Sequence, residues 1–184
     1  MSEAMLAPLS AWQTFYVLLG SAAATLTGLL FVVVTLVSGT LGSVSSPWSR
    51  LRAFNNPNVV HFGAALVIAA LLNMPWPVLW PAGLLVGLVG LGGSIYVFIA
   101  LWELRHRLSY PMMLSDWLWY TILPLITYIS LLVAGPLLPL FHALALFAIA
   151  AGTLLLVIMG IRNAWDIMTY MIIEGPQREN KSQD

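Results

Sequence analysis

The chain contains no cysteine and very few charged residues. Without a Cys among its 184 residues, disulfide scaffolds, thiolate metal sites and cysteine nucleophiles are all excluded. Charged residues make up 8% of the sequence, whereas a soluble domain carries about 25%. Lys and Arg number 7, as do Asp and Glu, so no net charge attracts nucleic acid or an acidic partner. This scarcity of charge predicts a membrane protein.

What the chain has instead is long apolar runs, and 60% of its residues are hydrophobic. The first run, residues 12–37, has no charge. As a helix it is about 39 Å long, at roughly 1.5 Å per residue, and crosses a bilayer. Its small residues Ala22, Ala23 and Ala24 are typical of a signal-peptide cleavage site, but no basic segment precedes the run. We therefore interpret it as a retained membrane anchor.

The later runs are separated by short stretches of loop and turn residues. The segment NMPWPVLWP at 73–81 predicts a turn at the membrane interface, because three prolines cannot continue a helix and Trp suits the headgroup region. Pro124 predicts a kink, and Gly175 with Pro176 predicts a helix end. We therefore expect an all-α fold: one transmembrane domain over residues 1–175, with helices at about 12–37, 59–74, 82–104, 116–135 and 141–173, and a disordered cytoplasmic tail at 176–184.

The distribution of basic residues predicts the orientation of these five spans. If the N-terminus is outside, every Lys and Arg falls in an inner segment, as the positive-inside rule requires; these are Arg50, Arg52, Arg105, Arg107, Arg162, Arg178 and Lys181. The two outer turns, 73–81 and 135–140, carry no charge. The sequence therefore predicts an outside N-terminus and a cytoplasmic C-terminus.

Small residues recur along two of the predicted helices. Because lipid offers no hydrophobic effect between helices, close backbone approach over small residues is a main source of helix association. We interpret these residues as packing positions that join helix 12–37 to helix 82–104, with a homo-oligomer contact as the alternative and a pore lining as a third reading. The residues are Gly20, Ala24 and Gly28 in the first helix, and Gly83, Gly87, Gly90 and Ser94 in the other.

Ionisable residues are absent from the middle of every predicted span, which counts against proton-driven pumps and ion-coupled carriers. They gather instead near the inner boundary, where Glu103 and Arg107 are four residues apart, as are Arg162 and Asp166. One interpretation is that they are topology signals at helix ends. The other is a cytoplasmic polar network that closes the bundle or contacts a lipid headgroup, formed by Glu103, Arg107, Asp116, Arg162, Asn163 and Asp166.

Catalytic and cofactor motifs are missing from the sequence. His61 and His106 are expected near the inner boundary and His142 near the outer one, so the three histidines cannot share a metal ion. No nucleophile elbow, HExxH, GxGxxG or phosphate loop occurs. We therefore expect a protein that is not an enzyme and has no catalytic residues, no metal and no cofactor.

Two segments carry a resemblance to known proteins. The first helix contains AAATLTGLLFVVVTLVSG, and the later segment SDWLWYTILPLITY combines an acidic and aromatic start with a proline-containing helix. Both resemble segments of small multi-pass bacterial inner-membrane proteins of unknown function. The resemblance implies the cytoplasmic (inner) membrane of a bacterium and assigns no activity.

We expect a protein that acts through helix–helix association, as a homo-oligomer or as a regulator or partner of other membrane proteins, with membrane lipids as its surroundings and no nucleic acid. The alternative is a passive channel or small-solute pathway. Hydroxyls that converge on a cavity favour permeation, whereas hydroxyls that bond to their own helix favour association. The hydroxyls concerned are those of Thr25, Thr27, Ser94, Thr121, Thr127, Ser130 and Thr153.

Overall fold

The computed structural model describes residues 2–40, 57–107 and 117–181. All regular elements within these ranges are helices, and none is a strand, so the all-α prediction is confirmed. The elements are α1 (Ser2–Thr40), α3 (Pro57–Asn73), α4 (Leu79–Arg107), the π-helical η2 (Leu118–Ile122), α6 (Leu123–Leu137) and α7 (His142–Lys181).

Four segments of these helices are long and apolar enough to cross a membrane. They are Leu9–Val33, Leu79–Glu103, Leu118–Leu137 and His142–Asp166. α3 is also apolar but shorter, at 17 residues. The chain is therefore a membrane-type helical protein.

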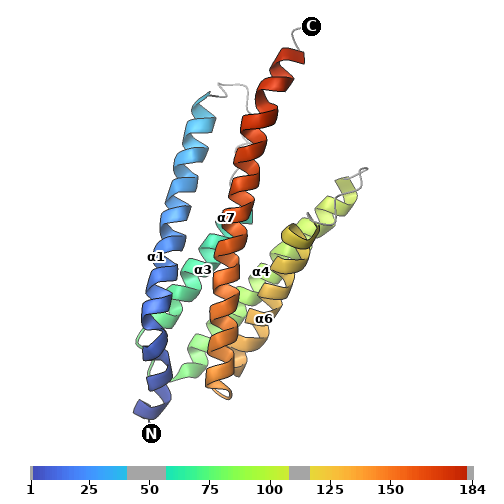
Figure 1. Ribbon diagram of the computed structural model, residues 1–184. Coiled ribbons are helices and arrows are strands. Elements are labelled where there is room, and N and C mark those ends of the chain that lie inside the picture. Colours follow the sequence, from blue (N-terminus) through green and yellow to red (C-terminus); the bar gives the residue numbers. More distant parts are fainter. Residues whose placement is uncertain (1, 41–56, 108–116, 182–184) are drawn as a thin grey trace.

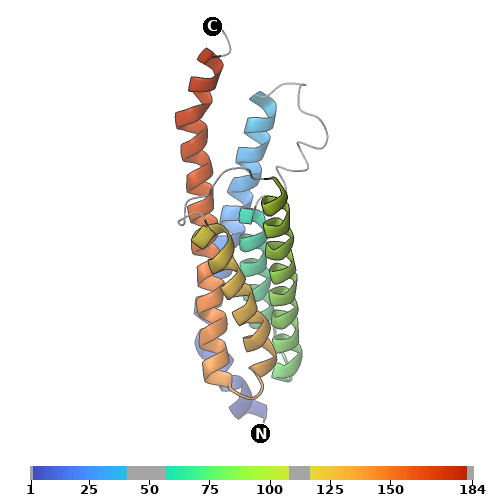
Figure 2. The ribbon, with the colours of Figure 1, turned by 90° about the vertical axis from the view of Figure 1, so that its right-hand side faces the viewer.

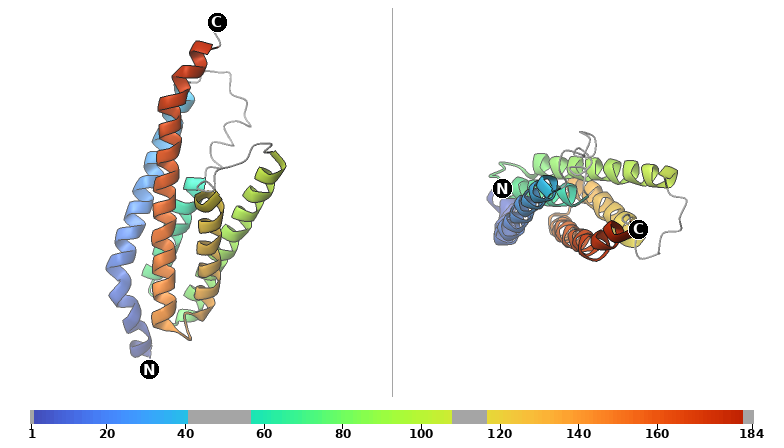
Figure 3. Two further views of the ribbon diagram at one scale, coloured as in Figure 1. Left: turned by 45° about the vertical axis from the view of Figure 1, so that its right-hand side comes forward. Right: turned by 90° about the horizontal axis from the view of Figure 1, so that it is seen from above.

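The helices alternate in direction and form an elongated bundle (Figures 1 and 2). One end of the bundle carries the start of α1, the α3–α4 turn at 74–78 and the α6–α7 turn at 138–141; we call it the turn end. The opposite end carries Pro57, Glu103, Leu118 and Arg162, and we call it the charged end. α1 and α7 continue past the charged ends of α3 and α6 (Figure 3). The two termini lie at opposite ends of the molecule (Figure 1).

α3 lies inside the bundle and contacts α1, α4 and α7. Its buried residues recur every three or four positions, so they form one continuous face of the helix: Asn58, His61, Phe62, Ala65, Ile68, Ala69 and Leu72. α7 packs against both α3 and α6. The core is therefore built around α3 and the middle of α7.

α4 and α6 pack through glycines, with almost no side chain between their backbones. A Cβ atom at Gly83 would collide with the carbonyl of Gly135, and one at Gly90 would collide with the backbone of Leu132. At Gly87 a Cβ would lie 3.1 Å from Cδ of Pro136. Glycine is required here because the two helices approach each other at the backbone.

The helix pairs differ from the pair that the small-residue pattern suggested. The sequence interpretation joined helix 12–37 to helix 82–104, whereas in the structure α1 packs on α3 and α4 packs on α6. The physical reason is connectivity, because helices that follow one another in the chain usually become neighbours. A stripe of small residues shows which face is used but not which helix it meets.

The small residues of α1 also do not share one environment. Gly20 is buried, and a Cβ there would lie 2.9 Å from Cβ of Ala69, whereas Ala24 and Gly28 are exposed. A spacing of four residues turns roughly 40° further around the helix at every step. The small residues that follow Gly20 therefore no longer face α3.

The start of the α6 rod departs from the predicted simple kink at Pro124. A π-helical turn, η2, precedes the proline, and the Leu123 N–H donates to the Leu118 carbonyl across this wider turn. Pro124 has no N–H to donate, so the regular hydrogen-bond ladder is already interrupted at this point. A wider turn, rather than a sharp bend alone, accommodates it.

α7 continues beyond the predicted helix end. The Gly175–Pro176 pair and the following residues were expected to start a disordered tail, but α7 runs through them to Lys181. The fixed φ of proline is compatible with a helix, so the pair interrupts one hydrogen bond without stopping the rod. Residues 182–184 lie outside the described part of the chain.

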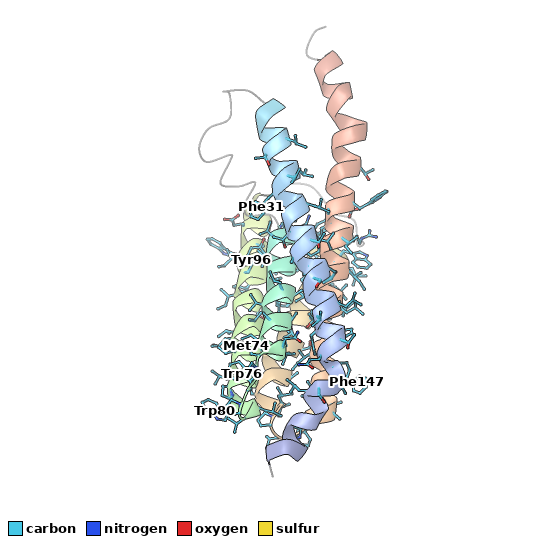
Figure 4. The ribbon with its side chains drawn as sticks, turned by 90° about the vertical axis from the view of Figure 1, so that its left-hand side faces the viewer. Phe31, Met74, Trp76, Trp80, Tyr96 and Phe147 are labelled. Carbon is cyan, nitrogen blue, oxygen red and sulfur yellow. The ribbon has the colours of Figure 1, made fainter. Side chains whose placement is uncertain are left out.

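Aromatic side chains join the helices at the turn end. The rings of Trp12 and Phe147 meet edge to face with centroids 4.7 Å apart, which links α1 to α7. The Trp76 indole N–H donates to the Leu71 carbonyl at 2.6 Å and closes the α3–α4 turn. Figure 4 shows Met74, Trp76 and Trp80 on one side of α1 and Phe147 on the other.

Candidate functional site

A buried polar pair joins three helices near the charged end. His61 of α3 is 2% exposed, and its Nδ1 lies 2.9 Å from the hydroxyl oxygen of Tyr128 on α6, which is 0% exposed. A Cβ at Gly93 of α4 would collide with the Tyr128 ring, so this ring lies directly on the α4 backbone. One hydrogen bond and one glycine contact therefore tie α3, α6 and α4 together.

Buried amides continue this polar region along the α3–α7 contact. The Phe62 ring lies against Gly160, since a Cβ at Gly160 would collide with it. α3 and α7 run in opposite directions (Figure 1), so one turn further toward the charged end brings Asn58 and Asn163 to the same level. Both side chains are buried, Asn163 at 1% exposure. The end of an otherwise apolar interface is therefore polar.

Asn163 is unusual because its side-chain amide is buried without a hydrogen bond to any described residue. Neither its Nδ2 nor its Oδ1 has a hydrogen-bond partner in the described part of the chain. A buried amide without partners costs free energy, so such groups are rare in folded proteins.

A second set of polar side chains lies at the surface, between η2 and α7. The Arg162 guanidinium carbon lies 4.5 Å from the centroid of the Trp119 ring, as a cation–π contact. Arg162 Nε is 3.9 Å from Asp166 Oδ2, and the Tyr120 hydroxyl donates to the same oxygen at 3.3 Å. Both charged side chains are partly exposed, so the ion pair itself adds little stability.

The predicted polar network is brought together only in part. Arg162, Asn163 and Asp166 lie on neighbouring turns of α7, with Asn163 facing the core and the other two facing η2. Glu103 is exposed on α4, and no described residue forms an ion pair with it. The Arg107 side chain and the whole of Asp116 fall outside the described part.

Four residues of the site were not singled out as site residues by the sequence analysis: Asn58, Trp119, Tyr120 and Tyr128. Trp119 lies in a run of aromatic residues expected at the membrane interface, which was a usable signal. Tyr128 gave none, because its partner His61 is 67 residues away and lies on another helix.

The chemistry available at this site is hydrogen bonding and one exposed cation. No group of three metal-ligating side chains occurs among the described residues. His61 lies at the charged end, whereas His142 begins α7 at the turn end.

The hydroxyl groups that were candidates for a pore lining bond to their own helices. Six of the seven donate to a carbonyl three or four residues earlier: Thr25, Thr27, Ser94, Thr127, Ser130 and Thr153. A hydroxyl that donates to a carbonyl of its own helix does not need pore water or a solute as a hydrogen-bond acceptor.

Comparison of the chain with models of known protein families, with curated proteins and with solved structures found no match. The chemistry of its own side chains is therefore the basis for inferring what the protein does.

The unused amide of Asn163 leads to a testable expectation. Asn163→Leu is expected to raise the free energy of unfolding by about 1 kcal/mol, because an apolar side chain of similar size removes an unpaired buried amide. Thermal unfolding in mild detergent measures the change. The matched control is Asn73→Leu, since the Asn73 amide donates to the Ala69 carbonyl at 2.8 Å and its loss brings no gain. A destabilised Asn163→Leu variant would contradict the expectation.

Proposed function

We propose that this chain is a non-enzymatic integral membrane protein that acts through helix–helix association, either with further copies of itself or as a partner or regulator of another membrane protein. The proposal is carried by the outward face of α1, which holds Ser21, Ala24, Thr25 and Gly28, all of them exposed. A Cβ at Gly28 would have nothing within 4 Å.

The chemistry of this α1 face suits contact with another helix. The hydroxyls of Ser21 and Thr25 donate to carbonyls of α1 itself, so the face has no donor that must be satisfied elsewhere. Small residues let a second backbone approach closely, as Gly20 does toward Ala69 within the bundle. Lipid chains fill such a shallow face less well than a helix does, which favours association.

We further propose that α3 is a fifth span, that the N-terminus is outside and that the C-terminus is cytoplasmic. An odd number of spans agrees with the two termini at opposite ends of the bundle (Figure 1). The basic residues Arg162 and Arg178 then lie on the cytoplasmic side, as the positive-inside rule expects. With the resemblance of the first helix to small bacterial membrane proteins, this supports the cytoplasmic membrane as the location.

A passive channel is the less supported alternative. Six candidate lining hydroxyls bond to their own helices. A hollow of about 320 Å³ is lined by turn-end residues such as Leu9, Gln13 and Trp76. It therefore does not lead to the polar side chains near His61 and Asn163.

Enlarging the α1 face tests the association proposal. The double variant Ala24→Leu with Gly28→Leu is expected to shift the protein from oligomers or partner complexes to single chains, because large side chains hold the second backbone away. Native mass spectrometry from mild detergent measures the ratio of complexes to single chains. If the variant loses roughly 1.4 kcal/mol of association free energy, the association constant falls about tenfold.

The matched control for this test is Gly92→Leu, which adds the same side chain to α4 at a glycine whose Cβ also has nothing within 4 Å. This variant is expected to keep the parent distribution. The proposal fails if the α1 double variant assembles as the parent does, or if the parent is a single chain without any copurified protein.

A further inference from the structure

Arg162 lies at the charged end of the bundle, where an aromatic side chain supports it. It lies on α7, and the face of the Trp119 ring, at the start of the η2–α6 rod, supports its guanidinium at 4.5 Å. A guanidinium over an aromatic ring is attracted by the ring face, which restricts where the arginine side chain can lie. The side chain is therefore oriented before any ligand arrives.

One hydrogen-bond donor of this guanidinium is unused, and the side chain is 41% exposed. Arginine has five N–H donors in a planar fork, and Nε of Arg162 is buried without a hydrogen-bond partner in the described part of the chain. Asp166 Oδ2 is 3.9 Å from Nε, which is beyond hydrogen-bond distance. The described residues thus supply no hydrogen-bond acceptor to Nε.

Asp166 forms a long ion pair with Arg162 and also contacts η2. Its Oδ2 accepts a hydrogen bond from the Tyr120 hydroxyl, so η2 holds the carboxylate as well. Because Nε is buried, the donors that an incoming anion can reach are the Nη groups of a side chain that is 41% exposed. The planar, bidentate edge of arginine matches the oxygens of a phosphate group.

The depth of the site identifies where such a phosphate comes from. Trp165 is 73% exposed three residues after Arg162, and Trp102 and Trp117 are also exposed at the charged end. Exposed tryptophans of a membrane helical protein lie at the headgroup level. Arg162 therefore lies at the level of the phospholipid phosphates.

We infer that Arg162, stacked on Trp119, binds a phosphate group, which at this depth is the phosphate of a phospholipid headgroup. The site is separate from the α1 face, so it stands or fails independently of the association proposal. Its role is to fix one lipid at the junction of η2 and α7.

Native mass spectrometry of the full chain from mild detergent tests the site through retained phospholipid. Arg162→Ala is expected to lower retention about tenfold, since a charge-assisted bidentate contact is lost. Arg162→Lys keeps the charge without the planar fork and is expected to lose several-fold. The matched control Arg178→Ala removes the same charge further along α7 and is expected to retain lipid as the parent does. Equal retention in parent and Arg162→Ala, or an equal loss in Arg178→Ala, would overturn the inference.

A second measurement distinguishes the source of the phosphate. Delipidated parent protein is heated with short-chain phosphatidylglycerol, with inorganic phosphate at matched ionic strength, or with a neutral glycolipid. A rise in the unfolding temperature with the phospholipid alone supports a headgroup site, and an equal rise with inorganic phosphate supports a phosphate site filled from solution. An equal rise with the neutral glycolipid would refute a phosphate site. Arg162→Ala is expected to lose whichever phosphate-dependent rise the parent shows.

Discussion

Alanine at Gly90 is expected to lower the free energy of unfolding by about 3 kcal/mol, at the upper end of what overpacking usually costs. A Cβ at this position would lie 2.8 Å from the Tyr128 carbonyl oxygen and would also collide with the Leu132 backbone. Backbone atoms of a helix cannot move aside as a flexible side chain does. α4 and α6 would therefore have to separate along their shared length.

Thermal unfolding in mild detergent measures this effect, and the expected fall in midpoint is about 10 °C for a chain of this size. The control is Gly92→Ala, the same substitution two residues further on, where a Cβ would have nothing within 4 Å. Gly92→Ala is expected to be neutral or stabilising by up to about 1 kcal/mol, because alanine favours a helix. Similar losses in both variants would mean that the α4–α6 contact at Gly90 is not responsible for the loss.

Removing the Tyr128 hydroxyl is expected to have the second largest effect. Tyr128→Phe leaves His61 Nδ1 without its partner at 2.9 Å, in a position that is almost completely buried. An unpaired buried polar group costs about 1–3 kcal/mol, so we expect a loss of about 2 kcal/mol. Tyr120→Phe is the control, since its hydroxyl is exposed and its contact with Asp166 is long.

A double-mutant cycle separates the hydrogen bond from simple cavity effects. His61→Leu combined with Tyr128→Phe removes both partners and leaves no orphaned group, so the double variant is expected to be less destabilised than the sum of the single ones. The coupling energy is expected to be about 1–2 kcal/mol. A coupling energy near zero would mean that the two side chains are neighbours but that their hydrogen bond does not stabilise the fold.

Much of the helical organisation follows from local patterns. Apolar runs, the proline-rich turn at 74–78 and the spacing of Gly83, Gly87 and Gly90 are properties of short windows, and short windows determine whether a helix forms and which face is flat. The closeness of Arg162 and Asp166 is likewise local, because residues four apart share a helix face.

The remaining features depend on contacts between distant parts of the chain. Nothing near Gly83 in sequence indicates that it meets Gly135, since a glycine stripe permits close approach by any flat partner. The His61–Tyr128 bond depends on where α3 reaches α6, and the orphaned Asn163 amide lies on α7, which packs against α3. The drift of Ala24 and Gly28 away from α3 depends on a small angle that accumulates along α1.

The short central helix also bears on which membranes suit this protein. α3, with 17 residues, is about 26 Å long, whereas the hydrocarbon core of a typical bilayer is about 30 Å thick. Its neighbours α1 and α7, with 39 and 40 residues, are each more than twice as long. Our proposal that α3 is a fifth span therefore implies a hydrophobic mismatch along α3, which a thinner bilayer or a tilted bundle would accommodate. On that proposal, lipids with short acyl chains relieve the mismatch, and the thickness of the bilayer is expected to influence which membranes hold this protein.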